Sequence, residues 1–156
     1  MEKLTDLLEE IEGCLQEKIV DTFYPAVVEE DIMKIVSLLN GEKFPVELLA
    51  VLKWHNGQVW NSEFSPENNR RLMSSKEIIE TISFYIDPMS DFLEPWDKSW
   101  IPILTNDSSD YLVYVTKGID KGKLIGYWHN DEDRIVEYKS LNEWANELIL
   151  EIQGVA

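Results

Sequence analysis

The side chains best suited to acid–base chemistry are two histidines in matching surroundings. His55 and His129 each stand between a tryptophan and an asparagine. A histidine titrates near neutral pH and can serve as a general acid or base. His55, however, follows an apolar helical stretch, where an imidazole often bonds the last carbonyls and complements the helix dipole. We interpret both histidines as structural, whereas two imidazoles facing each other in a cleft would favour an enzyme.

A second set of candidates consists of acids crowded into two short segments, Asn106–Asp110 and Asn130–Asp133. Carboxylates two or three residues apart could chelate a hard cation. Neither segment has the following glycine and distal glutamate that complete a calcium loop. Asn and Asp also favour turns, because their side chains bond the local backbone. We therefore expect turns and no metal at these segments.

Other catalytic and cofactor motifs do not occur. The sequence has no glycine-rich phosphate loop, no serine nucleophile elbow and no metalloprotease helix. Its single cysteine, Cys14, rules out an internal disulfide and a cysteine-based zinc cluster, and its spacing from Ile11 predicts a small core residue. We expect a protein that is not an enzyme and uses no cofactor.

Charge and composition narrow the possible partners. The formal net charge is −16, from 30 acidic and 14 basic side chains, so a phosphate backbone would be repelled and nucleic-acid binding is not expected. An acidic surface favours encounter with a basic protein, although solubility alone also explains it. The chain lacks an apolar run of about 18 residues for a membrane span and starts without a signal-peptide pattern, so we expect it in the cytoplasm.

Hydrophobic periodicity predicts four helices in the N-terminal part. They run from Leu4 to Ile19, from Val28 to an Asn40-Gly41 stop, from Pro45 at the first helical position to an Asn56-Gly57 left-handed cap, and from a Ser74 cap to Asp87-Pro88. In the third helix, Pro45, Leu48, Leu49 and Leu52 share one face. Glu77 completes a capping box with Ser74. The polar segment from Asn61 to Arg71 is expected to be a surface loop.

From Trp100 onward, short apolar runs separated by turns predict an antiparallel meander. The expected strands are Trp100–Thr105, Tyr111–Val115, Leu124–Trp128 and Arg134–Tyr138. Their connections are too short for the crossover helix that parallel pairing would need. A last helix is expected after Ser140, with Glu143 completing a second capping box and Trp144 on its buried face.

These motifs occur in a familiar order. The chain has a helix ending in Gly41, then Phe44-Pro45, a Leu-rich turn and Asn56-Gly57, followed by Trp100-Ile101-Pro102-Ile103, Tyr111–Val115 and Ser140-Leu141-Asn142-Glu143-Trp144. This arrangement resembles the SUKH superfamily of the Smi/Knr type over most of residues 28 to 152. The long Asn61–Arg71 segment and the first helix depart from the pattern.

The resemblance implies both a fold and a function. SUKH members include bacterial immunity proteins that neutralise polymorphic toxins, often nucleases, and fungal regulators of cell-wall assembly. We therefore expect one α+β domain over residues 1–156, with an N-terminal helix and link at 1–25 and a core at 26–153. In it, an antiparallel sheet of about four to six strands packs with helices. The expected function is an immunity protein that binds a cognate toxin, and the alternative is a regulatory or scaffold module with a cellular partner.

Acidic and aromatic residues in the turns are the predicted partner-binding surface. They are Asp107, Asp110, Tyr111, Trp128, His129, Asp131, Glu132 and Asp133. Charge would steer a basic toxin, and a few buried aromatics would supply most of the affinity. The alternative is that the two aromatics face the core and the acids only solvate hairpin ends. The sequence leaves both alternatives and the oligomeric state open.

Overall fold

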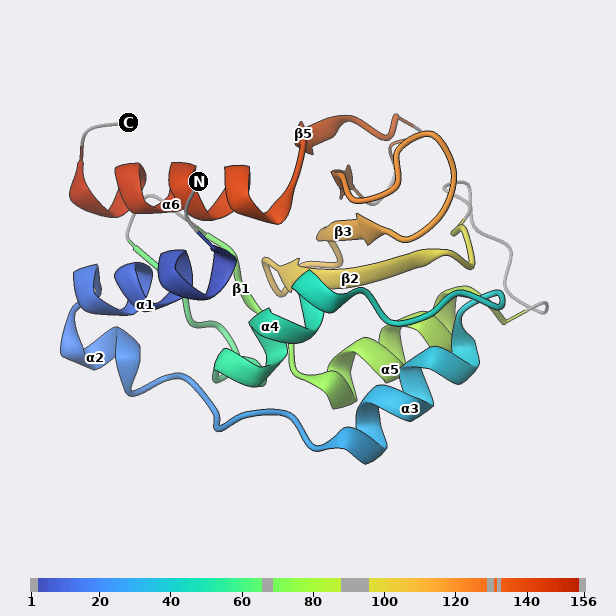
Figure 1. Ribbon diagram of the computed structural model, residues 1–156, viewed down its shortest axis with the longest axis horizontal. Helices are drawn as coiled ribbons and strands as arrows, with labels where there is room; N and C mark the ends of the chain where they lie inside the picture. The colour runs from blue at the N-terminus through green and yellow to red at the C-terminus, as the bar shows by residue number, and fades with distance from the viewer. Residues whose placement is uncertain (1–2, 66–68, 88–95, 129–130, 132, 155–156) are drawn as a thin grey trace.

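The computed structural model describes residues 3–65, 69–87, 96–128, 131 and 133–154. Within these ranges the chain forms six helices and one five-stranded antiparallel sheet, which confirms the α+β class (Figure 1). The helices are α1 (Leu4–Cys14), α2 (Glu17–Val20), α3 (Glu29–Leu38), α4 (Val46–Trp54), α5 (Ser75–Tyr85) and α6 (Leu141–Gln153). The strands are β1 (Arg71–Leu72), β2 (Trp100–Thr105), β3 (Tyr111–Val115), β4 (Leu124–Tyr127) and β5 (Val136–Tyr138).

The sheet is a meander in which each strand pairs with the next along the chain. Thr105 at the end of β2 pairs with Tyr111, which in turn pairs with Tyr127 at the end of β4. The β2–β3 turn and the β4–β5 connection therefore leave the sheet at the same end. We call this the turn end, and the β3–β4 hairpin lies at the opposite end.

Both faces of the sheet are buried, by different means. On β3, Leu112 and Tyr114 belong to the main core, while Val113 and Val115 belong to a second cluster, as alternation along a strand requires. Helices α1, α3, α4, α5 and α6 all contribute to the main core. Aromatic side chains cover the second cluster instead.

The helices are arranged as two packed pairs. Helices α1 and α6 lie side by side at one end of the molecule, and α3 and α5 pack together below the sheet (Figure 1). Helix α4 contacts α1, so the N-terminal helix is part of the main packing. Leu7, Leu8 and Ile11 of α1 are at most 1% exposed.

The predicted first helix was too long. It breaks at Leu15, whose backbone is extended, and Glu17–Val20 forms the short separate helix α2. Gly13, a poor helix former, weakens the last turn of α1 and accounts for the break. Cys14 at the end of α1 is half-buried and lies outside the buried core, so its core assignment was also wrong.

The predicted ends of the third helix need correction. Pro45 caps α4 from outside, because its ψ of 135° is extended although its φ of −64° would suit a helix. The helix ends at Trp54, and His55 is already extended, so Asn56-Gly57 is not its cap. Val51 is buried with Leu48 in α4, whereas Leu49 is only half-buried.

Asn56-Gly57 instead joins α4 to the start of α5. The Asn56 side chain accepts a hydrogen bond from the Ser75 N–H at 2.6 Å and donates one to the Ser75 hydroxyl at 3.0 Å. Gly57 has a φ of +91°, and a Cβ atom there would lie 2.6 Å from the backbone nitrogen of Ser74. The backbones approach too closely for any side chain at Gly57.

The Asn61–Arg71 segment is not wholly a surface loop. Phe64 and Ser65 are buried, and Arg71 is only 2% exposed and begins β1, a strand that the sequence did not predict. Toward the other edge of the sheet, β4 stops at Tyr127 and β5 starts only at Val136, so both strands are shorter than predicted.

The two predicted helix starts are confirmed, one of them only in part. Ser74 and Glu77 form the complete capping box of α5. At α6, the Ser140 hydroxyl accepts from the Glu143 N–H, but the Glu143 carboxylate accepts from the Lys139 N–H at 3.2 Å instead of from Ser140.

Candidate partner-binding end of the sheet

The turn end brings together the two acidic segments of the sequence. Asp107 and Asp110 lie in the β2–β3 turn, and Asp131 and Asp133 lie between β4 and β5. Two other predicted site residues, His129 and Glu132, fall outside the described ranges. The meander, and not proximity in sequence, is what places these acids at one end.

The β2–β3 turn is stabilised by hydrogen bonds between its own residues, as its Asn and Asp content led us to predict. Asp107 and Ser109 have φ values of 63° and 68°, in the left-handed region. The Asn106 side chain accepts a hydrogen bond from the Ser108 N–H at 2.8 Å and donates one to the Asp110 carboxylate at 3.1 Å. The turn is therefore held from within.

Arg71 anchors this turn from inside the protein. Its Nη2 lies 2.7 Å from Asp107 Oδ1 and 2.6 Å from Glu77 Oε2, and its Nε lies 2.8 Å from Asp107 Oδ2. Its Nη1 donates to the carbonyls of Gln58 and Leu72, each at 3.1 Å. One buried guanidinium thus joins β1, the start of α5 and the β2–β3 turn.

This ion cluster changes the acid–base behaviour of its members. Burial alone would lower the pKa of Arg71 and raise that of Glu77. The hydrogen bonds and opposite charges outweigh burial, so the pKa of Arg71 is raised and that of Glu77 is lowered. Arg71 and Glu77 therefore stay charged at neutral pH, and the formal charges of Arg71, Glu77 and Asp107 sum to −1.

Asp107 is committed to this cluster. Its side chain is only 8% exposed, and its Oδ2 also accepts the Asn61 N–H at 2.8 Å. Asp107 consequently fixes the position of the turn and presents little carboxylate surface to a partner.

Tyr111 is half-buried at the same end. Its ring meets that of Tyr85 on α5 edge to face, with centroids 6.1 Å apart. Burial raises the pKa of Tyr111, and the negative charges of Asp110 and Asp107 add to this shift. The phenol is therefore neutral at physiological pH, with one side held by α5.

Trp128 is 40% exposed and folds back over the strand that it follows. A Cβ at Gly126 would meet the Glu137 carboxylate first and would also lie 2.8 Å from the Trp128 Nε1, so the glycine leaves room for both side chains. The Arg70 guanidinium lies 5.9 Å from the indole centroid and bonds both carboxylate oxygens of Glu137 at 2.9 Å. Trp128 therefore has one supported face and one accessible face.

Asp131 and Asp133 are exposed. Arg134, next to them, donates to their backbone carbonyls at 2.6 and 3.0 Å, while its guanidinium lies 4.2 Å from the Tyr127 ring centroid. No salt bridge to either carboxylate occurs in the part of the chain that the structure describes. Their negative charges face solvent.

His55 lies in a different part of the molecule. Its Nδ1 donates to the Tyr24 carbonyl at 2.9 Å, and its Nε2 lies 2.5 Å from Glu12 Oε1. The ring stacks on Phe23, with centroids 4.5 Å apart. These contacts tie α1 to the end of α4, which is a structural role.

Trp60 and a neighbouring pocket escaped the sequence analysis. The indole is 71% exposed, and it lines a pocket of about 280 Å³ together with Arg71, Glu80 and Tyr111. A lone tryptophan just before a polar segment is the only sequence signal for it. The pocket itself depends on α5 approaching the β2–β3 turn, which no local pattern reveals.

The described ranges show neither a candidate metal centre nor a membrane-spanning helix. No group of three or more His, Cys, Asp or Glu residues there is placed to hold a metal ion. No helix among those residues has the length and apolar character that crossing a membrane requires.

The fold is thus an antiparallel meander covered on one face by helices. The model of the SMI1 / KNR4 family (SUKH-1) matches residues 26–147. The chain belongs to this family, as its motifs predicted. A comparison with individual curated proteins gave no match.

Proposed function

We propose that this protein is an immunity protein that binds a cognate polymorphic or contact-dependent toxin and neutralises it by protein–protein interaction. Membership of the SMI1 / KNR4 (SUKH-1) family supports the proposal, because that family type includes immunity proteins. The observation that carries it is the turn end, where exposed acids and a half-exposed tryptophan come together on a chain of net charge −16. In this proposal the protein acts in the cytoplasm, without catalysis or cofactor.

The turn end suits a basic partner in two ways. Long-range attraction to the exposed carboxylates of Asp131 and Asp133 would speed the encounter and set the orientation. Trp128, supported on one face and accessible on the other, would then supply contact area that excludes water. If the toxin is a nuclease, the acids would occupy the channel that normally binds phosphates.

Co-expression with toxins encoded nearby tests the proposal. Cells carrying one such toxin should survive only when this protein is present, and the two proteins should co-purify. Loss of protection with every neighbouring toxin, or protection without a complex, would contradict neutralisation by binding.

A regulatory or scaffold module with a cellular partner is the second candidate. The family name itself covers the fungal regulator type, which favours this alternative. A gene position beside signalling or envelope genes, without a toxin gene, would support the regulator. A stable complex with a cellular protein would then replace the toxin complex in co-purification.

A further inference from the structure

The pocket beside Trp60 has a negatively charged floor with fixed geometry. Arg71 binds Glu77 and Asp107 through short charge-assisted hydrogen bonds, so these carboxylates cannot swing out toward a ligand. The three groups sum to −1, and Glu80 on the rim adds a further negative charge. Although it contains an arginine, the pocket is therefore negative overall.

Glu80 is the exposed acid that lines this pocket. It is exposed on α5, and the structure records no ion pair for it within the described ranges. A carboxylate in this setting can turn toward an incoming cation without first breaking an internal bond.

Trp60 forms the outer wall. Its indole meets no other aromatic ring among the residues that the structure covers. The backbone beside it is nevertheless anchored: the Val59 N–H bonds the Thr22 carbonyl at 2.9 Å, and the Asn61 N–H bonds Asp107 at 2.8 Å. A large aromatic ring on a fixed backbone is typical of the residues that dominate binding energy at interfaces.

We infer that this pocket accepts an arginine side chain of the partner protein, stacked on Trp60 and paired with Glu80. The inference deepens the proposed function and rests on it, because it identifies the chemistry by which the partner is held. A guanidinium combines a flat face for an indole with a fork for a carboxylate, which an ammonium does not. The volume of about 280 Å³ is just below that of ordinary small-molecule sites and suits one long side chain.

The test uses Nα-acetyl-arginine amide as the probe and Nα-acetyl-citrulline amide, which has nearly the same shape without the charge, as its control. The chain has six tryptophans, so six indole N–H signals report by NMR, and the signal missing in Trp60→Phe is assigned to Trp60. Arginine should shift the Trp60 signal saturably and more than the other five. Citrulline should leave it nearly unchanged.

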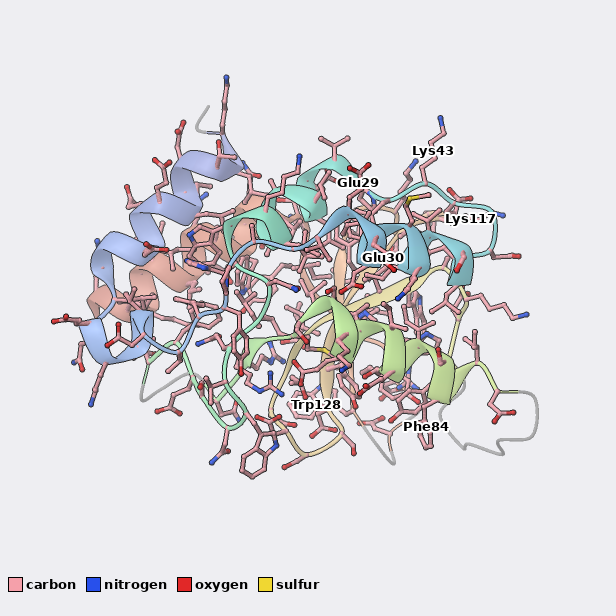
Figure 2. The ribbon with its side chains drawn as sticks, turned by 90° about the horizontal axis from the view of Figure 1, so that it is seen from below. Glu29, Glu30, Lys43, Phe84, Lys117 and Trp128 are labelled. Carbon is pink, nitrogen blue, oxygen red and sulfur yellow. The ribbon has the colours of Figure 1, made fainter. Side chains whose placement is uncertain are left out.

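Variants locate the binding groups. Trp60→Ala, followed through the backbone signal of Glu80, and Glu80→Gln should each weaken the arginine probe by about two- to fivefold. Glu29→Gln removes the same charge from an exposed position on α3, at the margin of the molecule opposite Trp128 and Phe84 in Figure 2, and should leave binding unchanged. Equal shifts from arginine and citrulline, or equal affinity in wild type and Glu80→Gln, would overturn the inference.

A second arm separates this inference from the proposed function. With the toxin captured by co-expression, Trp60→Ala and Glu80→Gln should weaken the complex while Glu29→Gln does not. Full affinity in both pocket variants would overturn the arginine pocket and leave the immunity function standing. Failure of the wild-type protein to bind any toxin would remove the immunity function, and the small-probe titration would still decide whether the pocket binds a guanidinium.

Discussion

A Cβ atom at Gly57 would lie 2.6 Å from the Ser74 nitrogen and 2.7 Å from its Cα, both of them backbone atoms that cannot turn away. Gly118 has nearly the same φ, +92° against +91°, but nothing lies within 4 Å of its Cβ position. Substitutions at the two glycines therefore separate the loss of stability caused by a left-handed backbone from the loss caused by a steric clash.

Gly118→Ala should lower the free energy of unfolding by about 1 kcal/mol, because only the backbone conformation is strained. Gly57→Ala should lower it by at least about 2 kcal/mol, because overpacking adds to that strain. Urea unfolding of both variants measures the difference. Equal losses of unfolding free energy in the two variants would mean that the backbone between α4 and α5 shifts to make room for the Cβ atom at little cost.

Glu77 links stability to pH. Its pKa in the folded protein lies below the ordinary glutamate value of 4.5, so its stabilising effect is complete above that pH and is lost as the pH falls through the folded value. Glu77→Gln should therefore be less stable than wild type at pH 7, and the gap in unfolding free energy should narrow below about pH 4.5. Glu80→Gln removes a carboxylate from an exposed position of the same helix and serves as the control, because a surface substitution should change the free energy of unfolding at pH 7 by less than about 0.5 kcal/mol. A gap that stays constant from pH 7 to pH 3 would show that the carboxylate charge of Glu77 is not what stabilises the fold.

At the scale of elements, hydrophobic period and capping residues predicted the existence and type of most helices and strands. The helix starts at Ser74 and Ser140 were accurate, because a cap is a local signal. Strand β1 was missed because Arg71 is a charged residue whose burial depends on Glu77 and Asp107, residues that are 6 and 36 positions away. The Trp60 pocket is also formed by residues that are distant in sequence. Sequence patterns therefore predicted the acidic turns but not the cavity beside them.

Helix α1 precedes the residues that match the family model, yet it belongs to the core. Ile11 is fully buried, whereas Thr5 on the same helix is exposed. Ile11→Ala should lower the free energy of unfolding by about 2–5 kcal/mol, and Thr5→Ala should change it by less than about 0.5 kcal/mol. Thermal or urea unfolding measures both. A small loss in Ile11→Ala would indicate that α1 is a peripheral addition to an independently stable core.

At the scale of the whole molecule, charge is unevenly distributed between the two ends of the sheet. The turn end carries the exposed Asp131 and Asp133, whereas the β3–β4 hairpin at the other end carries three lysines, Lys117, Lys121 and Lys123, and one acid, Asp120, which pairs with Lys123. In Figure 2, Lys117 lies at the upper right of the molecule and Trp128 lies in its lower part. A basic partner is therefore drawn to one end of an acidic protein in preference to the other.

Replacing Asp131, Glu132 and Asp133 with alanine tests this orientation, because it changes the net charge from −16 to −13 at the turn end alone. Association with the captured toxin should slow and its dependence on salt should flatten, while dissociation changes little. A matched control variant replaces Glu9, Glu10 and Glu29 with alanine. It has the same net charge of −13, but the three replaced glutamates lie on α1 and α3, away from the turn end. Because charges more than about 10 Å apart are largely screened at 0.1 M salt, this variant should slow association much less. Stopped-flow or surface-binding kinetics at several salt concentrations measures both variants. Equal slowing in the two would mean that net charge alone guides the encounter, and unchanged kinetics in the first would remove the turn end from the binding surface.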